Sequence, residues 1–248
     1  MWKTLELPTA SAPGLAGWLH GFNATPLLLS LKIAGLATLV VFFTGVLIAR
    51  LLAHKHFFGK SIIEAVFLLP LVLPPTVVGF GLLILFGRNG LIGRWLLSWF
   101  DVQIVFTWLG AVLASIVVAF PLMFQSASAA FQTIDQKFEN AARTMGASEW
   151  KVFWTISFPL AWPGLLAGLV LAFARALGEF GATLMIAGYI PGKTDTIPLA
   201  IYFAVEAGQM EKAVFWVVII VALGFSSIVW LNWWSKHNMR RFANQKGQ

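Results

Sequence analysis

The sequence predicts an all-α protein, a polytopic helical membrane protein with about five transmembrane helices. Of its 248 residues, 59% are hydrophobic and 11% are charged, whereas soluble domains carry about 25% charged residues. The charges leave five uncharged runs, most of them close to the roughly 20 residues that a helix needs to cross a bilayer. These two observations exclude a soluble enzyme and a disordered binding protein.

We expect a single transmembrane domain over residues 1–248 with five spans in order along the chain. Their expected ranges are about 26–52, 62–86, 103–127, 160–181 and 213–235. The first span contains Lys32, whose long side chain can reach the interface. Before it, residues 15–22 fit either an interfacial segment or a short tail, and no removable signal peptide is apparent. The apolar stretches 180–192 and 196–205 are too short to cross alone, so we expect them to be re-entrant or surface segments.

The distribution of basic residues predicts the orientation. Five spans place the two termini on opposite sides of the membrane. With the C-terminus in the cytoplasm and Arg175 left inside the fourth span, ten Lys and Arg residues lie inside and six outside. Because basic residues favour the inner side, we expect an outside N-terminus and a cytoplasmic C-terminus.

The cytoplasmic loop at 129–158 is expected to contain two short helices. Thr133–Gln136 matches a capping box, which predicts that a helix begins near Asp135. Gly146 is a typical stop for this helix. Ser148 can cap a second helix, which Pro159 would end or kink.

The first of these helices has an apolar face and a charged flank. Glu139 and Arg143 lie off the apolar face as a favourable i, i+4 pair. Small residues on an apolar face allow a partner to approach closely. Docking to a partner and folding back onto the protein's own bundle both fit this pattern. The face comprises residues at i, i+3, i+4 and i+7, namely Phe138, Ala141, Ala142 and Met145.

The second expected span contains three prolines. Pro70, Pro74 and Pro75 remove backbone donors and break or kink a helix. The freed carbonyls are tolerated at membrane depth only where protein or a cavity satisfies them. Broken helices near a pathway are a feature of transporters, although a kink that serves packing alone also explains the prolines.

Two charges lie at the end of the fourth expected span. Arg175 and Glu179 share a helical face, and charges at this depth are costly and normally pair. At about 1.5 Å per residue from Leu160, Arg175 lies about 23 Å along the span, in its outer part. Three roles stay open: a gate pair, a structural salt bridge, or Arg175 as a direct anion ligand.

The cytoplasmic loop resembles the EAA loop of ABC importer permeases. The run Asn140–Gly146, followed after nine residues by Ile156–Pro159, keeps both Ala residues, the Gly and the Pro of that pattern. It departs at Asn140, where the family has Glu, and at Phe158, where it has Leu; Glu139 lies one position earlier. The resemblance implies a coupling helix that docks on a cytoplasmic ATPase through Phe138, Glu139, Asn140, Ala141, Ala142, Arg143, Met145, Gly146 and Pro159.

Four further segments resemble the permease subunits of molybdate ABC importers. They are Leu69–Gly79, Phe86–Gly93, Arg175–Ala182 and Ile190–Pro198. The Gly-Glu-Phe-Gly-Ala element within the third is also similar to sulfate permeases, and the double-Pro element and five spans favour molybdate. Candidate pathway or gate residues are Pro70, Pro74, Pro75, Thr76, Arg175, Glu179 and Phe180.

The resemblance implies the ABC importer permease fold and a channel-forming subunit whose alternating access an ATPase drives. The implied partners are a second copy of the chain, two cytoplasmic ATPase subunits and an extracytoplasmic molybdate-binding protein in a bacterial inner membrane, with no nucleic acid. The chain contains no Cys and no G-x-x-x-x-G-K-[ST] motif. We therefore expect no enzymatic activity, cofactor or metal in this chain, and ATP and Mg on the ATPase. The alternatives are a sulfate, thiosulfate or tungstate permease, or a membrane enzyme or assembly factor.

Overall fold

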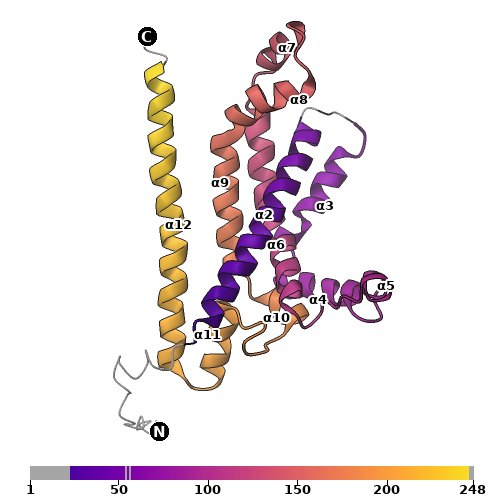
Figure 1. Cartoon of the computed structure of the whole chain (residues 1–248), viewed down its shortest axis with the longest axis vertical. Helices are drawn as coiled ribbons and strands as arrows, with labels where there is room; N and C mark the ends of the chain where they lie inside the picture. Colours follow the sequence, from indigo (N-terminus) through magenta and orange to yellow (C-terminus); the bar gives the residue numbers. More distant parts are fainter. Residues whose placement is uncertain (1–22, 54, 56, 246–248) are drawn as a thin grey trace, which may run out of the picture.

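The described part of the protein is helical. The computed structural model describes residues 23–53, 55 and 57–245, and no β-strand lies in this part of the chain. The all-α class is therefore confirmed. With the labels of Figure 1, the elements are α2 (Thr25–Ala53), α3 (Lys60–Val72), α4 (Pro75–Phe86), α5 (Leu91–Phe100), α6 (Trp108–Gln132), α7 (Gln136–Thr144), α8 (Glu149–Val152), the π-helical turn η1 (Phe153–Ser157), α9 (Phe158–Leu177), α10 (Gly181–Ala187), α11 (Ile197–Glu206) and α12 (Met210–Gln245).

The core is a bundle of α2, α6 and α9, which small residues hold close together. An added Cβ on Gly164 of α9 would lie 2.7 Å from the Cβ of Ala130 in α6. One on Gly168 would lie 2.7 Å from the Cβ of Ser126. Helices in membranes associate through close backbone approach at such small residues. The small residues thus let α9 approach α6 closely.

Four helices in the described chain are long and apolar enough to cross a membrane, and a broken pair could supply a fifth span. The four are Thr25–Ala53, Trp108–Gln132, Glu149–Leu177 and Met210–Trp230. The span expected at 62–86 is two helices, α3 and α4, bent by 112°. The count of five spans requires this pair to cross as one unit, and it stays a prediction.

The break between α3 and α4 follows from the double proline. Pro74 disfavours helical geometry in the residue before it, and Leu73 is extended, with φ −72° and ψ 143°. Pro75 then begins α4, because proline suits the first helical position, where its missing N–H leaves no bond unmade. The kink expected in the second span is thus a sharp bend between α3 and α4.

Other helix boundaries also differ from the expected ones. The helix α9 ends at Leu177 rather than near residue 181, and α12 (Met210–Gln245) is longer than the expected 213–235. The third span was expected from residue 103, but α6 begins at Trp108 after a turn in which Asp101 and Phe106 have positive φ. The helix expected to end or kink at Pro159 instead continues through η1 into α9. Pro159 lies in the first turn of α9, where a proline is tolerated.

The helix α12 lies at the edge of the bundle, where it packs on α9 and α11 (Figure 1). Only 11% of the apolar stretch of α12 is buried inside the protein, against 39–56% in the other three long helices. Its last turns lie at the same end of the molecule as α7 and α8, whereas α10 and α11 lie at the opposite end (Figure 1). The expected short segments at 180–192 and 196–205 correspond to α10 and α11.

Candidate functional site

The first site is the pair of short helices α7 and α8 at one end of the bundle. Asp135 caps α7, since its side chain accepts a hydrogen bond from the backbone N–H of Lys137 at 2.9 Å. Thr133 instead ends α6 and donates to the carbonyl of Ala130. The capping box was therefore wrong, although α7 begins where expected. Ser148 caps α8 as expected, by accepting from the backbone N–H of Lys151.

The predicted apolar face of α7 is divided between the inside and the outside of the protein. Ala142 is buried, whereas Phe138, Ala141 and Met145 are exposed. The side chain that α7 buries most deeply is Glu139, which is 2% exposed. This end of the molecule therefore presents apolar side chains outward and holds a carboxylate inward.

Glu139 is satisfied by three hydrogen-bond donors. Arg50, in the last turn of α2, binds both carboxylate oxygens, with Nη1–Oε1 at 2.8 Å and Nη2–Oε2 at 3.1 Å. The Ser157 hydroxyl donates to Oε1 at 2.7 Å, and Arg143 Nη2 donates to Oε2 at 3.0 Å. Burial alone would raise the Glu139 pKa, but hydrogen bonds from Arg50 and Ser157 lead the opposing causes and lower this pKa to about 2.

Arg143 extends the cluster to α8. Its Nε lies 2.6 Å from Oε1 of Glu149, and its Nη2 lies 3.1 Å from Oε2. Its Nη1 donates to the side-chain oxygen of Asn140 at 2.9 Å. We call Arg50, Glu139, Arg143, Glu149 and Ser157 the inner cluster; its two arginines balance its two carboxylates.

At the opposite end, the broken span meets α10. A Cβ on Gly79 of α4 would lie 2.7 Å from the Cα of Ala182, and one on Gly181 would lie 3.0 Å from the Cβ of Pro75. The structure thus brings Pro75 and Thr76 beside the segment that follows Glu179. Pro70 lies inside α3, before the bend. Two groups of predicted pathway residues that are about 100 positions apart therefore lie side by side.

Arg175 and Glu179 form an ion pair at the end of α9. Arg175 Nη1 lies 2.7 Å from Glu179 Oε2, and Oε1 accepts a hydrogen bond from the backbone N–H of Ala182 at 2.8 Å. Glu179 is 3% exposed. The Phe180 ring lies 5.2 Å, centroid to centroid, from the ring of Tyr202 in α11. The pair thus ties α9 to the first turn of α10.

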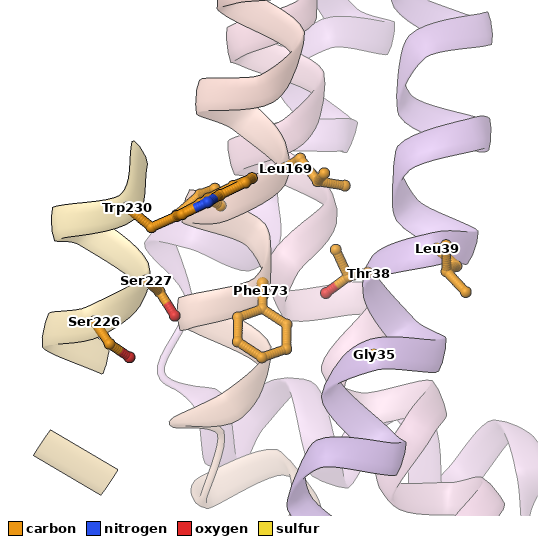
Figure 2. Close-up of a pocket in the computed structure, with 9 residues that line it drawn as sticks. Gly35, Thr38, Leu39, Leu169, Phe173, Ser226, Ser227 and Trp230 are labelled. Atoms are coloured by element: carbon orange, nitrogen blue, oxygen red, sulfur yellow. The ribbon is translucent and has the colours of Figure 1, made fainter. Parts of the chain in front are cut away.

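An apolar cleft of about 600 Å³ separates α12 from α2 and α9 (Figure 2). Figure 2 shows Phe173 and Trp230 facing it from α9 and α12, with Thr38 on the α2 side. The described residues that line it carry no charge. Its hydroxyls, on Thr38, Ser226 and Ser227, donate to carbonyls of their own helices. The cleft offers little to an oxyanion, so we do not assign it to the anion pathway.

Sequence reasoning missed Arg50 and Ser157. Arg50 was only one of the ten inner basic residues that predict the orientation, and Ser157 lies within the Ile156–Pro159 part of the loop motif. Arg50 and Glu139 are 89 positions apart, so no local spacing joins them. The sequence offered one general signal: a carboxylate that becomes buried needs a cation as its partner, and Glu139 would need one if its side of the helix packed inward.

The chain matches a known protein family over most of its length. The matching family is described as "Binding-protein-dependent transport system inner membrane component" and covers residues 42–241. The molybdenum transport system permease protein of Haemophilus influenzae is 47% identical to the chain over 216 residues, which are 87% of this chain and 94% of that protein. The molybdenum transport system permease protein of Escherichia coli K12 is 46% identical over 215 residues, 86% of this chain and 94% of that protein.

A solved structure has a similar fold. It is a bacterial ABC transporter involved in the import of the acidic polysaccharide alginate. The match has a TM-score of 0.70 and covers 92% of this chain and 85% of that chain. Identity is 17%, so this likeness concerns the fold alone.

Proposed function

Because the chain belongs to the family of binding-protein-dependent transport system inner membrane components, we propose that it is the membrane subunit of an ATP-driven importer for molybdate. The substrate is inferred from the named molybdenum permeases, which align with the chain over nearly their whole length. Its task is to form the pathway, and ATP is hydrolysed on another subunit.

The observation that carries the mechanism is the outward apolar surface of α7 and α8. Phe138, Met145 and Trp150 are 58%, 82% and 72% exposed at the end that we place in the cytoplasm. Large apolar side chains in contact with water mark an interaction site. We assign this surface to the docking of a cytoplasmic ATPase, with Ala141 and Gly146 at its centre.

The pathway is proposed at the opposite end. Pro70, Pro74, Pro75 and Thr76 surround the bend, and the Arg175–Glu179 pair and Phe180 lie at the start of the segment that packs on it. Movement of the docked loop would shift α9 and open or close this end, as a two-state rigid-body switch. The anion must bind weakly enough to leave, which favours an internally paired Arg175 over one that serves as a strong ligand.

The proposed assembly has two copies of this chain, two ATPase subunits that bind ATP and Mg, and an extracytoplasmic molybdate-binding protein. We place it in a bacterial inner membrane, with the N-terminus outside and the C-terminus in the cytoplasm. The first 22 residues and the last three lie outside the described residues. The same mechanics suit sulfate, thiosulfate or tungstate, and the Gly-Glu-Phe-Gly-Ala element is also similar to sulfate permeases.

Reconstitution tests this proposal. The complex with its ATPase and binding protein, in proteoliposomes, is expected to hydrolyse ATP faster with molybdate and to accumulate radiolabelled molybdate. Sulfate, thiosulfate and tungstate are added as competitors. Stronger competition by sulfate than by unlabelled molybdate would reassign the substrate. Purification without any ATPase, with no uptake, would favour a membrane enzyme or assembly factor instead.

A further inference from the structure

Glu139 is a charged residue that the outward surface of α7 does not use. Its neighbours Phe138 and Asn140 are exposed, whereas its own side chain is 2% exposed. A partner that docks on the outward surface would meet Asn140 before it met Glu139. The carboxylate of the loop therefore acts inside this chain.

The donors that hold Glu139 come from different elements. Arg50 is in the last turn of α2, Ser157 ends the π-helical turn before α9, and Arg143 is in α7 itself. The Arg50 guanidinium also lies 5.8 Å from the centroid of the Phe131 ring in α6. One carboxylate thus joins the loop to the inner end of the three-helix core.

The geometry of these contacts restrains rotation as well as distance. Arg50 binds both oxygens of Glu139, and such bidentate pairs are directional and stronger than single neutral hydrogen bonds. Ser157 is fully buried and lies on a π-helical turn, a feature that is frequent at functional sites. The loop therefore cannot turn relative to α2 and α9 without breaking charge-assisted bonds.

We propose that Glu139 is a positioning residue that makes the loop at 136–152 a rigid extension of α2 and α9. A displacement of the loop by the ATPase then passes to both helices as one body. From Ser157, α9 continues for 18 residues, or about 27 Å at 1.5 Å per residue, to Arg175. The inner cluster is thus linked by one helix to the ion pair at the opposite end. This inference rests on the proposed function for its mechanical role, but the anchoring itself does not.

Two labels on the same chain test the anchoring. The sequence has no Cys, so spin labels at Lys137→Cys on α7 and Leu28→Cys near the far end of α2 report one distance. Both positions are exposed. In nanodiscs without partners we expect one narrow distance distribution, which Glu139→Gln broadens about twofold and Glu206→Gln does not. Glu206, the last residue of α11, is the matched control because it loses the same charge from an exposed position outside the inner cluster. A distribution that Glu139→Gln leaves unchanged would overturn the anchoring.

Coupling is tested in the reconstituted complex. Glu139→Gln is expected to assemble and hydrolyse ATP, while molybdate taken up per ATP falls about tenfold, a size typical of coupling between sites. Ser157→Ala, which removes one donor, is expected to lower molybdate uptake per ATP about twofold, and the control Glu206→Gln to stay near wild type. Normal uptake per ATP in Glu139→Gln would overturn the positioning role.

These experiments distinguish a variant that fails to fold from a failure of the proposed function. If Glu139→Gln does not accumulate in membranes, Arg50→Lys keeps the cation and removes the bidentate geometry, and the same expectations apply to it. If wild-type complex shows no molybdate-dependent hydrolysis or uptake, the proposed function fails and the mechanical role fails with it. The distance measurement needs no transport, so it decides the anchoring in either case.

Discussion

At the residue scale, both ends of the molecule depend on a buried carboxylate paired with arginine. Glu139 is held by Arg50, which lies on another helix, whereas Glu179 is held by Arg175, four residues earlier in the sequence. A buried ion pair does not stabilise a protein greatly, but removing one partner leaves an uncompensated charge. Each pair therefore fixes geometry, and each is sensitive to a change in one partner alone.

We predict that Arg175 and Glu179 act as a pair. Arg175→Gln and Glu179→Gln should each lower complex stability and uptake, because each leaves the other charge unpaired. The double variant should do less harm than the sum, with a coupling energy of about 2 kcal/mol in thermal unfolding.

Additive effects would reject the pair. If Arg175 binds the anion directly, Arg175→Gln would abolish uptake while Glu179→Gln changed neither uptake nor the defect of Arg175→Gln. Lys212→Gln, at an exposed basic position that we place on the same side, is the control for loss of positive charge.

At the element scale, α7 ends because Gly146 leaves the helical region. Gly146 has φ +82°, and no atom lies within 4 Å of a Cβ added there. A side chain at position 146 therefore has space. The cost of replacing the glycine comes from the left-handed backbone conformation, which is unfavourable for other residues by roughly 1–2 kcal/mol. The turn between α7 and α8 therefore depends on glycine for its backbone.

Gly146→Leu is expected to leave the chain in the membrane while weakening ATPase association and uptake several-fold. Leu disfavours the left-handed backbone and adds bulk at the docking surface. Gly146→Asn is the matched control, since Asn tolerates this conformation and should retain more of both activities. Co-purification of the ATPase and molybdate uptake are the measurements. Normal values for both in Gly146→Leu would contradict a docking role for this turn.

At the scale of the whole molecule, the two sites lie at opposite ends of one bundle. The loop helices α7 and α8 and the last turns of α12 share one end, and α10 and α11 lie at the other (Figure 1). A long helix, α9, runs between the ends. This arrangement suits a protein that receives motion on one side of a membrane and opens a passage on the other.

We predict that loop 129–158 faces the cytoplasm and the turn after α10 faces outward. In this Cys-free chain, Lys137→Cys and Lys193→Cys are both exposed basic positions. An impermeant thiol reagent applied to cells with a permeabilised outer membrane should label Lys193→Cys. Labelling of Lys137→Cys should require that the inner membrane is also opened. Equal labelling of both from outside would contradict the orientation.

Local patterns in the sequence predicted the elements well. Composition and uncharged runs predicted the helical membrane class, because burying a backbone in lipid leaves few alternatives to helices. The start of α7 near Asp135, its end near Gly146 and the break at Pro74–Pro75 also followed from local chemistry. The loop motif and the double-proline element predicted the family that the comparison found. In each case the determining interactions lie within a few residues along the chain.

The tertiary structure decided what local patterns left open. It determined that α3 and α4 bend by 112° and that Phe138 and Met145 face outward while Glu139 faces inward. It also joined Arg50 to Glu139 across 89 positions. Helical periodicity defines faces but not which face packs, because that choice depends on the neighbours that supply a cation or a close-packed surface. These neighbours are brought together only when α2, α6 and α9 assemble.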